Sequence, residues 1–139
     1  LNSYSLDLTV GFANDETAAL GNLIFGGVLH RHPTLDVCIS HGGGNIPFLA
    51  GRLALAAKNR HTSPDWIREE GAFLNQLKLI WFDNHVHQDA SLRLLEEIVG
   101  NERQVLGTNF LGWDQPDRNS LKNFPSFLAG NAKKLLRLT

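Results

Sequence analysis

Apolar residues recur along the chain in two spacings that alternate with each other. Between Glu16 and Leu29 they fall at three- and four-residue steps, which predicts an amphipathic helix. Leu35–Ser40 is a short, partly branched apolar run that stops at three glycines, which is typical of a buried strand entering a tight turn. The same two spacings then repeat to the end of the chain. They predict helices after Pro47 and over 65–77, 90–99 and 125–138, strands over 79–86 and 105–110, and a polar loop from 112 to about 123.

Strands and helices that alternate regularly are typical of βα units around a parallel sheet. The sequence therefore predicts an α/β fold with parallel strands. Its 139 residues, 42% of them hydrophobic, fit one domain over residues 1–139, and no repeat, low-complexity tract or linker divides it. A complete (β/α)8 barrel typically needs about 250 residues, so this chain is too short to be one.

Charge and composition exclude several classes of protein. Thirteen Lys and Arg against fourteen Asp and Glu give a net charge of -1, so we expect no broad cationic field and no nucleic-acid partner. No apolar run is long enough to span a membrane, and no signal-peptide pattern opens the chain. The single cysteine, Cys38, is predicted to be buried, in a protein of the reducing cytoplasm. The chain begins at Leu1 and contains no methionine, so we expect a processed or truncated piece.

The sharpest local feature is the sequence Ser-His-Gly-Gly-Gly-Asn over 40–45. His41 stands at the carboxyl end of a predicted strand, where parallel α/β proteins place reacting groups. The glycines allow a ligand to approach the backbone, and their amides could bind a small anion, although the Lys-Ser/Thr pair of a phosphate loop is missing. A hydrogen-bonded strand end followed by a simple turn is the alternative.

A second candidate lies in the predicted strand over 79–86 and just beyond it. Alternation along a strand places Asp83, His85 and His87 on one face, and two imidazoles with a carboxylate suit a metal ion. Solvated or capping side chains at a strand end are the alternative, because a metal site needs three or four convergent ligands.

A third candidate follows the predicted strand over 105–110. Asn109 and Asp114 carry short oxygen-bearing side chains just past the strand, and Trp113 offers an apolar or stacking wall. Turn formation alone also selects Asn, Gly and Asp at such places.

Five stretches, taken in order, form a specific combination. They are Tyr4–Phe12 with Glu16-Thr17, Gly26–Arg52 with its His-Gly-Gly-Gly at 41–44, Phe82–Leu95, Val105–Asn109, and Ala129–Leu136. Together they resemble the carboxyl-terminal half of the amidohydrolase-related family that includes aminocarboxymuconate semialdehyde decarboxylase and γ-resorcylate decarboxylase. The resemblance covers nearly the whole chain and implies the part of a (β/α)8 TIM barrel that contains about strands 6–8.

The resemblance also implies an activity. Members of that family hold one divalent metal, commonly zinc, at the carboxyl ends of the strands, and act as metal-dependent hydrolases or nonoxidative decarboxylases. We therefore expect a small carboxylated substrate, aromatic ones included. The resemblance assigns His41 to the catalytic histidine, which polarises the metal-bound water and shuttles a proton. Gly42, Gly43 and Trp113 are the residues expected to bind the substrate.

The metal ligands depart from the family pattern in two ways. Asn109 occupies the position of a metal-binding Asp, and a neutral amide is the poorer ligand, so Asp114 is a candidate substitute. The family's His-x-His on the first strand and its histidine on the fifth have no counterpart here, and His85 with His87 is interpreted as a coincidence of spacing. We therefore expect zinc in a full-length protein and none in this chain alone.

Two other interpretations come from different classes. A noncatalytic fragment would associate with itself to cover its open sheet edges, so a homo-oligomer is expected. A small-anion binding module using the turn over 42–44 would need no metal. The partners expected overall are a small-molecule substrate and a second copy of the chain, with no nucleic acid and no membrane.

Overall fold

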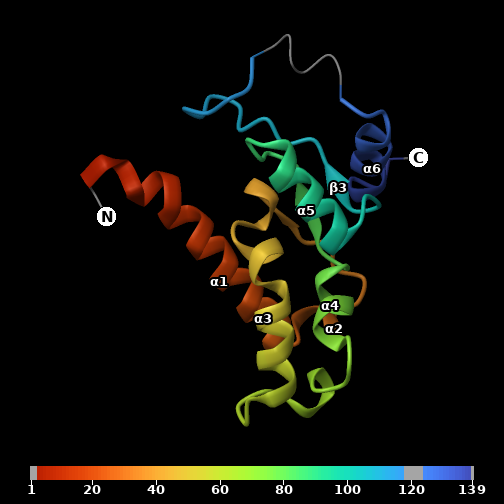
Figure 1. Cartoon of the computed structure of the whole chain (residues 1–139). Coiled ribbons are helices and arrows are strands. Elements are labelled where there is room, and N and C mark those ends of the chain that lie inside the picture. The colour runs from red at the N-terminus through yellow and green to blue at the C-terminus, as the bar shows by residue number, and fades with distance from the viewer. Residues whose placement is uncertain (1–2, 118–123, 139) are drawn as a thin grey trace.

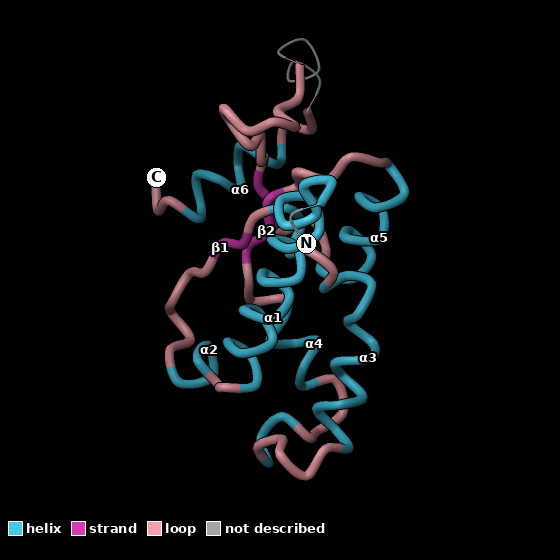
Figure 2. Tube along the Cα trace, turned by 90° about the vertical axis from the view of Figure 1, so that its left-hand side faces the viewer, coloured by secondary structure: helices cyan, strands magenta, loops and turns pink. Residues whose placement is uncertain are grey.

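A three-stranded parallel sheet forms the centre of the molecule. The computed structural model describes residues 3–117 and 124–138. Its strands are β1 (Cys38–Ile39), β2 (Trp81–Asp83) and β3 (Gln104–Val105), in the order β1-β2-β3. Cys38 pairs with Trp81, and Phe82 pairs with Gln104. Figure 2 shows the strands above a group of helices, with α6 on the far side. The predicted α/β fold with parallel strands is confirmed, and its alternation of strands and helices fits the predicted part of a (β/α)8 barrel.

Helices separate the strands, as the alternation predicts. α1 (Phe12–Phe25) and α2 (Val28–Arg31) precede β1, and α3 (Ile46–Asn59) and α4 (Ala72–Leu77) lie between β1 and β2. α5 (Asp89–Val99) leads to β3, and α6 (Phe127–Leu135) packs beside it. The amino-terminal end of α1 extends away from the other helices (Figure 1). None of the described helices is long and apolar enough to cross a membrane.

The strands are correctly placed but shorter than predicted. After β2 the Val86 N–H donates to the Asn84 carbonyl, which turns the chain out of the sheet. Just beyond β3, the Gly107 N–H donates to the Asn84 side chain and not to a neighbouring strand. Further on, Asn109 and Leu111 have left-handed φ values of 41° and 66°, which no strand adopts. Among the described residues, the outer strands β1 and β3 each pair on one side only, with β2.

Glycines divide two of the predicted helices. The helix expected over Glu16–Leu29 begins earlier, at Phe12, and ends at Phe25, after which the Gly26 N–H donates to the Asn22 carbonyl. Gly27 then adopts a left-handed φ of 66°, which separates α1 from α2. The helix expected over 65–77 becomes a 3-10 turn, Asp65–Ile67, and then α4, with a left-handed Gly71 between them.

The other helices follow the sequence pattern more closely. α3 after Pro47 and α5 over 90–99 are confirmed, and the closing helix is shorter than expected. Residues 118–123 of the predicted polar loop lie outside the described part of the chain.

The core lies between β2 and the helices below it. Its fully buried side chains include Leu20, Ile24, Ile46, Phe73, Phe82 and Leu95. At one point the packing leaves no room for a side chain: a Cβ on Gly43 would lie 2.7 Å from Cε1 of Phe82. Cys38, in contrast, is exposed and not buried as predicted. Side chains alternate across a strand, and the Cys38 side chain lies on the uncovered face of β1.

Candidate active site

A histidine and a buried carboxylate meet at the end of β1. His41 follows the strand in the 3-10 turn His41–Gly43, with an unusual φ of 48°. Its Nδ1 lies 2.8 Å from Oε1 of Glu16, a side chain of α1. The same oxygen accepts a hydrogen bond from the Ser40 hydroxyl. Because Nδ1 is engaged, Nε2 is the ring nitrogen left for the adjoining pocket.

The surroundings of His41 favour its protonated form. Burial lowers the pKa of His41, but the hydrogen bond and the negative charge of Glu16 raise it, with smaller contributions from Asp83 and Asp114. The net result is a pKa above the ordinary value of 6.5. An imidazole whose pKa is raised in this way can take up and release a proton near neutral pH.

The three glycines after His41 have their amides occupied within the chain. Gly42 N–H donates to Oδ1 of Asp83 at 3.2 Å, Gly43 N–H to the Ser40 carbonyl, and Gly44 N–H to the His41 carbonyl. The turn therefore has no free amide for a small anion. Gly42 and Gly43 are buried behind the pocket, whereas Gly44 lines it, so the predicted substrate contacts of Gly42 and Gly43 stay predictions.

A second group forms where the loop after β2 meets the loop after β3. Nε2 of His85 and Nε2 of His87 each lie 3.1 Å from Oδ2 of Asp114. The Asn109 amide donates to the other carboxylate oxygen, Oδ1. The side chains of His85 and Asp114 are only 5% and 9% exposed, whereas His87 reaches solvent. Residues from two separate loops thus converge on one carboxylate.

The Asp114 carboxylate is held in its ionised form. Burial acts to raise its pKa, but hydrogen bonds from Asn109 and His85 lower the pKa of Asp114 to about 2. A buried, ionised carboxylate beside two imidazoles is a strong candidate ligand for a cation.

Asp83 does not join that group, contrary to the alternation prediction. β2 ends at Asp83, so the residues after it no longer follow a strand. Oδ1 of Asp83 accepts from the backbone N–H of Gly42 and of His85, and burial raises the pKa of this carboxyl despite those bonds. His85 itself is buried beside Asp114, so it is not the solvated side chain that the alternative at this strand end implied.

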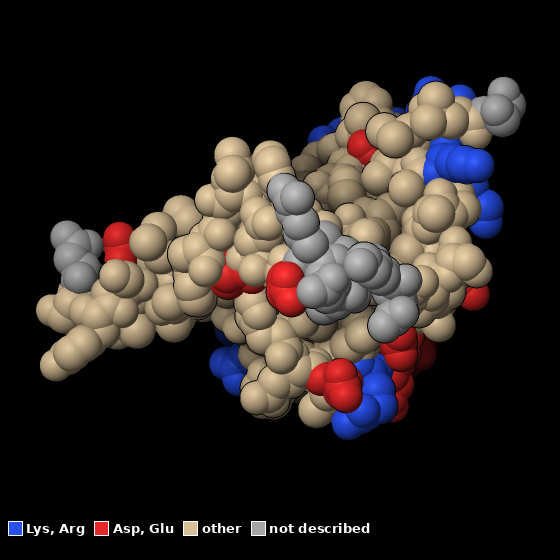
Figure 3. All heavy atoms as spheres, turned by 90° about the horizontal axis from the view of Figure 1, so that it is seen from above, with Lys and Arg blue, Asp and Glu red and all other residues tan. Residues whose placement is uncertain are grey.

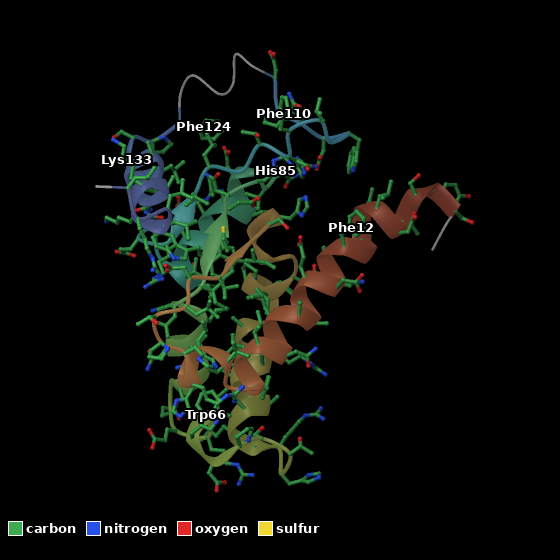
Figure 4. The ribbon with its side chains drawn as sticks, turned by 180° about the vertical axis from the view of Figure 1, so that it is seen from behind. Phe12, Trp66, His85, Phe110, Phe124 and Lys133 are labelled. Carbon is green, nitrogen blue, oxygen red and sulfur yellow. The ribbon has the colours of Figure 1, made fainter. Side chains whose placement is uncertain are left out.

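The two groups adjoin each other at one pocket. Among the described residues, the ligand atoms of His41, His85 and Asp114 all lie within 4.8 Å of one another. They line a cavity of about 620 Å³ whose apolar walls include Phe12 of α1 and Trp113. Figure 4 shows His85 between the loop that carries Phe110 and the part of α1 that carries Phe12. The predicted residues His41, Asn109, Trp113 and Asp114 are thus brought together.

Two residues of this site, Glu16 and Phe12, have no site role predicted from the sequence. Glu16 is one of several acidic residues near the start of a helix, and nothing local sets it apart. Phe12 lies before the predicted start of its helix. His85, in contrast, belongs to the second candidate that the sequence indicates, and the structure places it in the pocket.

The similarity of this chain to known proteins identifies its family. A family model described as "Amidohydrolase" matches residues 3–138. The chain belongs to the amidohydrolase family. This amidohydrolase is 34% identical to the 2-amino-3-carboxymuconate-6-semialdehyde decarboxylase of Dictyostelium discoideum, over 97% of this chain and 40% of that protein. It is 33% identical to the enzyme of the same name from Caenorhabditis elegans, over 79% of this chain and 27% of the relative.

The other similarities are more distant. A 2-keto-4-carboxy-3-hexenedioate hydratase of Sphingobium is 26% identical over 70% of the amidohydrolase chain and 26% of its own length. The crystal structure of Metarhizium anisopliae IDCase in apo form superposes with a TM-score of 0.68 and 21% identity, over 99% of this chain and 38% of that one. The latter likeness shows the fold alone. The chain spans about 40% or less of the length of each of these proteins.

Proposed function

We propose that this chain is a portion of a metal-dependent amidohydrolase that removes CO2, without oxidation, from a small carboxylated substrate, aromatic ones included. The observation that carries the proposal is the convergence of His41, His85 and Asp114 on one pocket. Decarboxylation is preferred to hydrolysis because the two relatives above 30% identity are both named decarboxylases.

The donor atoms at the pocket fit a divalent metal such as zinc. Imidazole nitrogen and carboxylate oxygen are ordinary zinc ligands, and His85 with Asp114 would hold the ion. Asn109, predicted at the metal position, supports Asp114 through its amide. When bound, the metal supplies positive charge that polarises a water or a carboxylate. A catalytic zinc takes three protein ligands, so we propose that a full-length protein completes the site and that this chain alone holds no stoichiometric zinc.

The residues of this chain supply the proton for the reaction and the apolar walls of the pocket. In decarboxylation the C–C bond breaks, CO2 leaves, and the carbon that keeps the electron pair must take a proton. His41 supplies that proton from Nε2, while Nδ1 stays bound to Glu16. Phe12 and Trp113 face an unsaturated or aromatic substrate, with Gly42 and Gly43 shaping the turn behind it. No Lys or Arg is present among the described residues that line the pocket, so positive charge for the substrate carboxylates would come from the metal, from protonated His41 or from the remainder of a full-length protein.

Turnover tests this proposal. The protein that contains this chain, loaded with zinc, is incubated with 2-amino-3-carboxymuconate-6-semialdehyde and with hydroxylated aromatic acids, and CO2 release is measured. His41→Ala should lower turnover by about 10²–10⁴-fold with an unchanged circular dichroism spectrum. His61→Ala, which changes an exposed histidine outside the pocket, is the control. Full activity in His41→Ala would remove His41 from the mechanism, and no CO2 from any substrate would reject the proposed activity.

A second candidate function, self-association, has support of its own. The amino-terminal arm before Phe12 exposes Leu6, Leu8 and Val10, and Asp7 is its one charged residue over 3–11. Figure 3 shows the arm projecting from the body with no Lys or Arg on it. β1 and β3 also end the sheet on both sides. A second copy of the chain is therefore the proposed partner, with neither nucleic acid nor membrane. A cytoplasmic location stays a prediction, with which the exposed thiol of Cys38 agrees.

A further inference from the structure

The carboxylate of Glu16 is buried in an environment that offers it few partners. Its side chain is 14% exposed, although it belongs to a helix near the surface. Oε1 accepts from Ser40 and from His41, while Oε2 is buried with no hydrogen-bond partner in the described part of the chain. A buried polar atom without a hydrogen-bond partner lowers the stability of the fold, so its presence calls for an explanation. Among the described residues, His41 is the basic group with which Glu16 forms an ion pair.

The packing of α1 holds Glu16 at this place. The neighbouring Thr17 hydroxyl accepts from the Asn45 N–H at 2.8 Å and donates to the Ala13 carbonyl at 2.6 Å. A Cβ on Gly44 would lie 2.1 Å from that same carbonyl oxygen. The backbone of α1 is therefore in direct contact with the turn that carries His41, and the distance between Glu16 and the imidazole is fixed by two rigid elements.

The imidazole, for its part, is directed at Glu16 by an unusual backbone. His41 has a φ of 48°, which is uncommon for a residue with a side chain and is found most often where the surrounding structure imposes it. A carboxylate can only accept a hydrogen bond, so a contact of 2.8 Å to Nδ1 requires the proton to be on Nδ1. In the neutral ring, Nε2 then carries the lone pair.

We propose that Glu16 is the positioning residue of His41, fixing the ring tautomer and orientation in which Nε2 exchanges a proton with the pocket. When Nε2 accepts a proton from solvent or substrate, the ring becomes an imidazolium, and the negative charge of Glu16 stabilises it. When Nε2 gives the proton up, the ring returns to the neutral Nδ1–H form. The Ser40 hydroxyl donates to the same Glu16 oxygen and holds the carboxylate in place. This role rests on the proposed function of His41 as the proton donor.

The tautomer can be observed without any turnover. In ¹⁵N NMR spectra of the metal-free 139-residue chain, recorded at one pH where His41 is neutral, Nδ1 should carry the proton. Glu16→Ala should return the ring to an equilibrium of both tautomers. Glu16→Gln keeps an accepting oxygen and should preserve the Nδ1–H form. Glu70→Ala, which removes an exposed carboxylate bonded to Lys58, is the matched control and should leave the His41 signals unchanged.

Kinetics of the complete, zinc-loaded enzyme give the second readout. Glu16→Ala should lower kcat by about 10–100-fold with little change in KM, and Glu16→Gln should restore part of the loss. A mere packing role would not discriminate between the two variants in this way. An Nε2–H tautomer in the wild-type chain would overturn the proposal even if Glu16→Ala fails to fold, as would a folded Glu16→Ala with unchanged His41 signals. Tautomer changes as expected, in an enzyme that releases no CO2, would instead reject the proposed activity and leave the pairing intact.

Discussion

Nε2 of His85 lies 3.1 Å from Oδ2 of Asp114, a residue 29 positions later in the chain. The contact joins the loop after β2 to the loop after β3, and both side chains are more than nine-tenths buried. It places the carboxylate of Asp114, the candidate substitute for the Asp that position 109 lacks, at the proposed metal site, and it adds a buried imidazole to the pocket.

Metal content provides a direct test of that contact. In a full-length protein, Asp114→Ala should weaken zinc retention by more than the roughly 10–100-fold typical for losing a group that only supports a ligand. Elemental analysis after dialysis is the measurement, and Asp65→Ala, on an exposed 3-10 turn, is the control. Unchanged zinc in Asp114→Ala would return this residue to a loop-forming role. One tightly held ion per 139-residue chain would show that the chain completes the site alone.

Self-association is expected of the 139-residue chain at micromolar concentration. The exposed apolar arm and the two unpaired sheet edges favour a dimer or a larger assembly. Sedimentation velocity measures the state. Leu8→Asp on the arm should shift it toward monomer, whereas Leu55→Asp, at an exposed leucine of α3, should not. A monodisperse, folded wild-type monomer would contradict the prediction.

Two glycine substitutions should have opposite effects on stability. Gly43→Ala places a Cβ 2.7 Å from the Phe82 ring at a φ of 77°, so the free energy of unfolding should fall by about 1–3 kcal/mol. Gly51→Ala lies within α3 with nothing inside 4 Å, and the better helix propensity of alanine should raise stability by up to about 1 kcal/mol. Urea denaturation midpoints measure both. Equal midpoints for the two variants would mean that the turn after His41 is not tightly packed.

Acid should weaken the attachment of the carboxyl-terminal segment. The Asp36 carboxylate accepts from Nε1 of Trp81 at 2.9 Å and from Arg137 at 3.2 Å, and these bonds lower its pKa from 3.8. Because the pKa of Asp36 is lower in the folded than in the unfolded state, its ionised carboxylate stabilises the fold at pH values above the ordinary pKa of 3.8. This stabilisation is lost as the pH falls through the lowered pKa.

Two substitutions test this dependence of stability on pH. Asp36→Asn should cost roughly 1 kcal/mol at neutral pH and show a smaller loss of stability between pH 5 and the lowered pKa of Asp36 than the wild type. Arg137→Gln, which removes one hydrogen-bond donor and leaves Trp81 and the nearby Arg103, should have an intermediate effect. Denaturation midpoints across this range are the measurement, and a wild-type pH dependence in Asp36→Asn would contradict it.

The sequence by itself determined the kind of fold and the order of its elements. Apolar spacing depends only on neighbouring residues, so α3, α5 and the three strand positions could be located, and the glycine turn after His41 indicated a strand end. Local pattern did not give the ends of the strands, because these depend on where partner strands stop and where Asn109 and Leu111 turn left-handed. The local pattern also predicts a buried Cys38. Helices distant in sequence decide which face of β1 is covered, and they leave this side chain exposed.

The site was decided by the tertiary structure. Glu16 reaches His41 across 25 residues and His85 reaches Asp114 across 29, and no spacing rule connects residues so far apart. Only the parallel arrangement, which brings the carboxyl ends of β1, β2 and β3 to one edge, makes these side chains neighbours. Burial in the same pocket then separates His85 from the exposed His87, although the sequence presents the two as an equivalent pair.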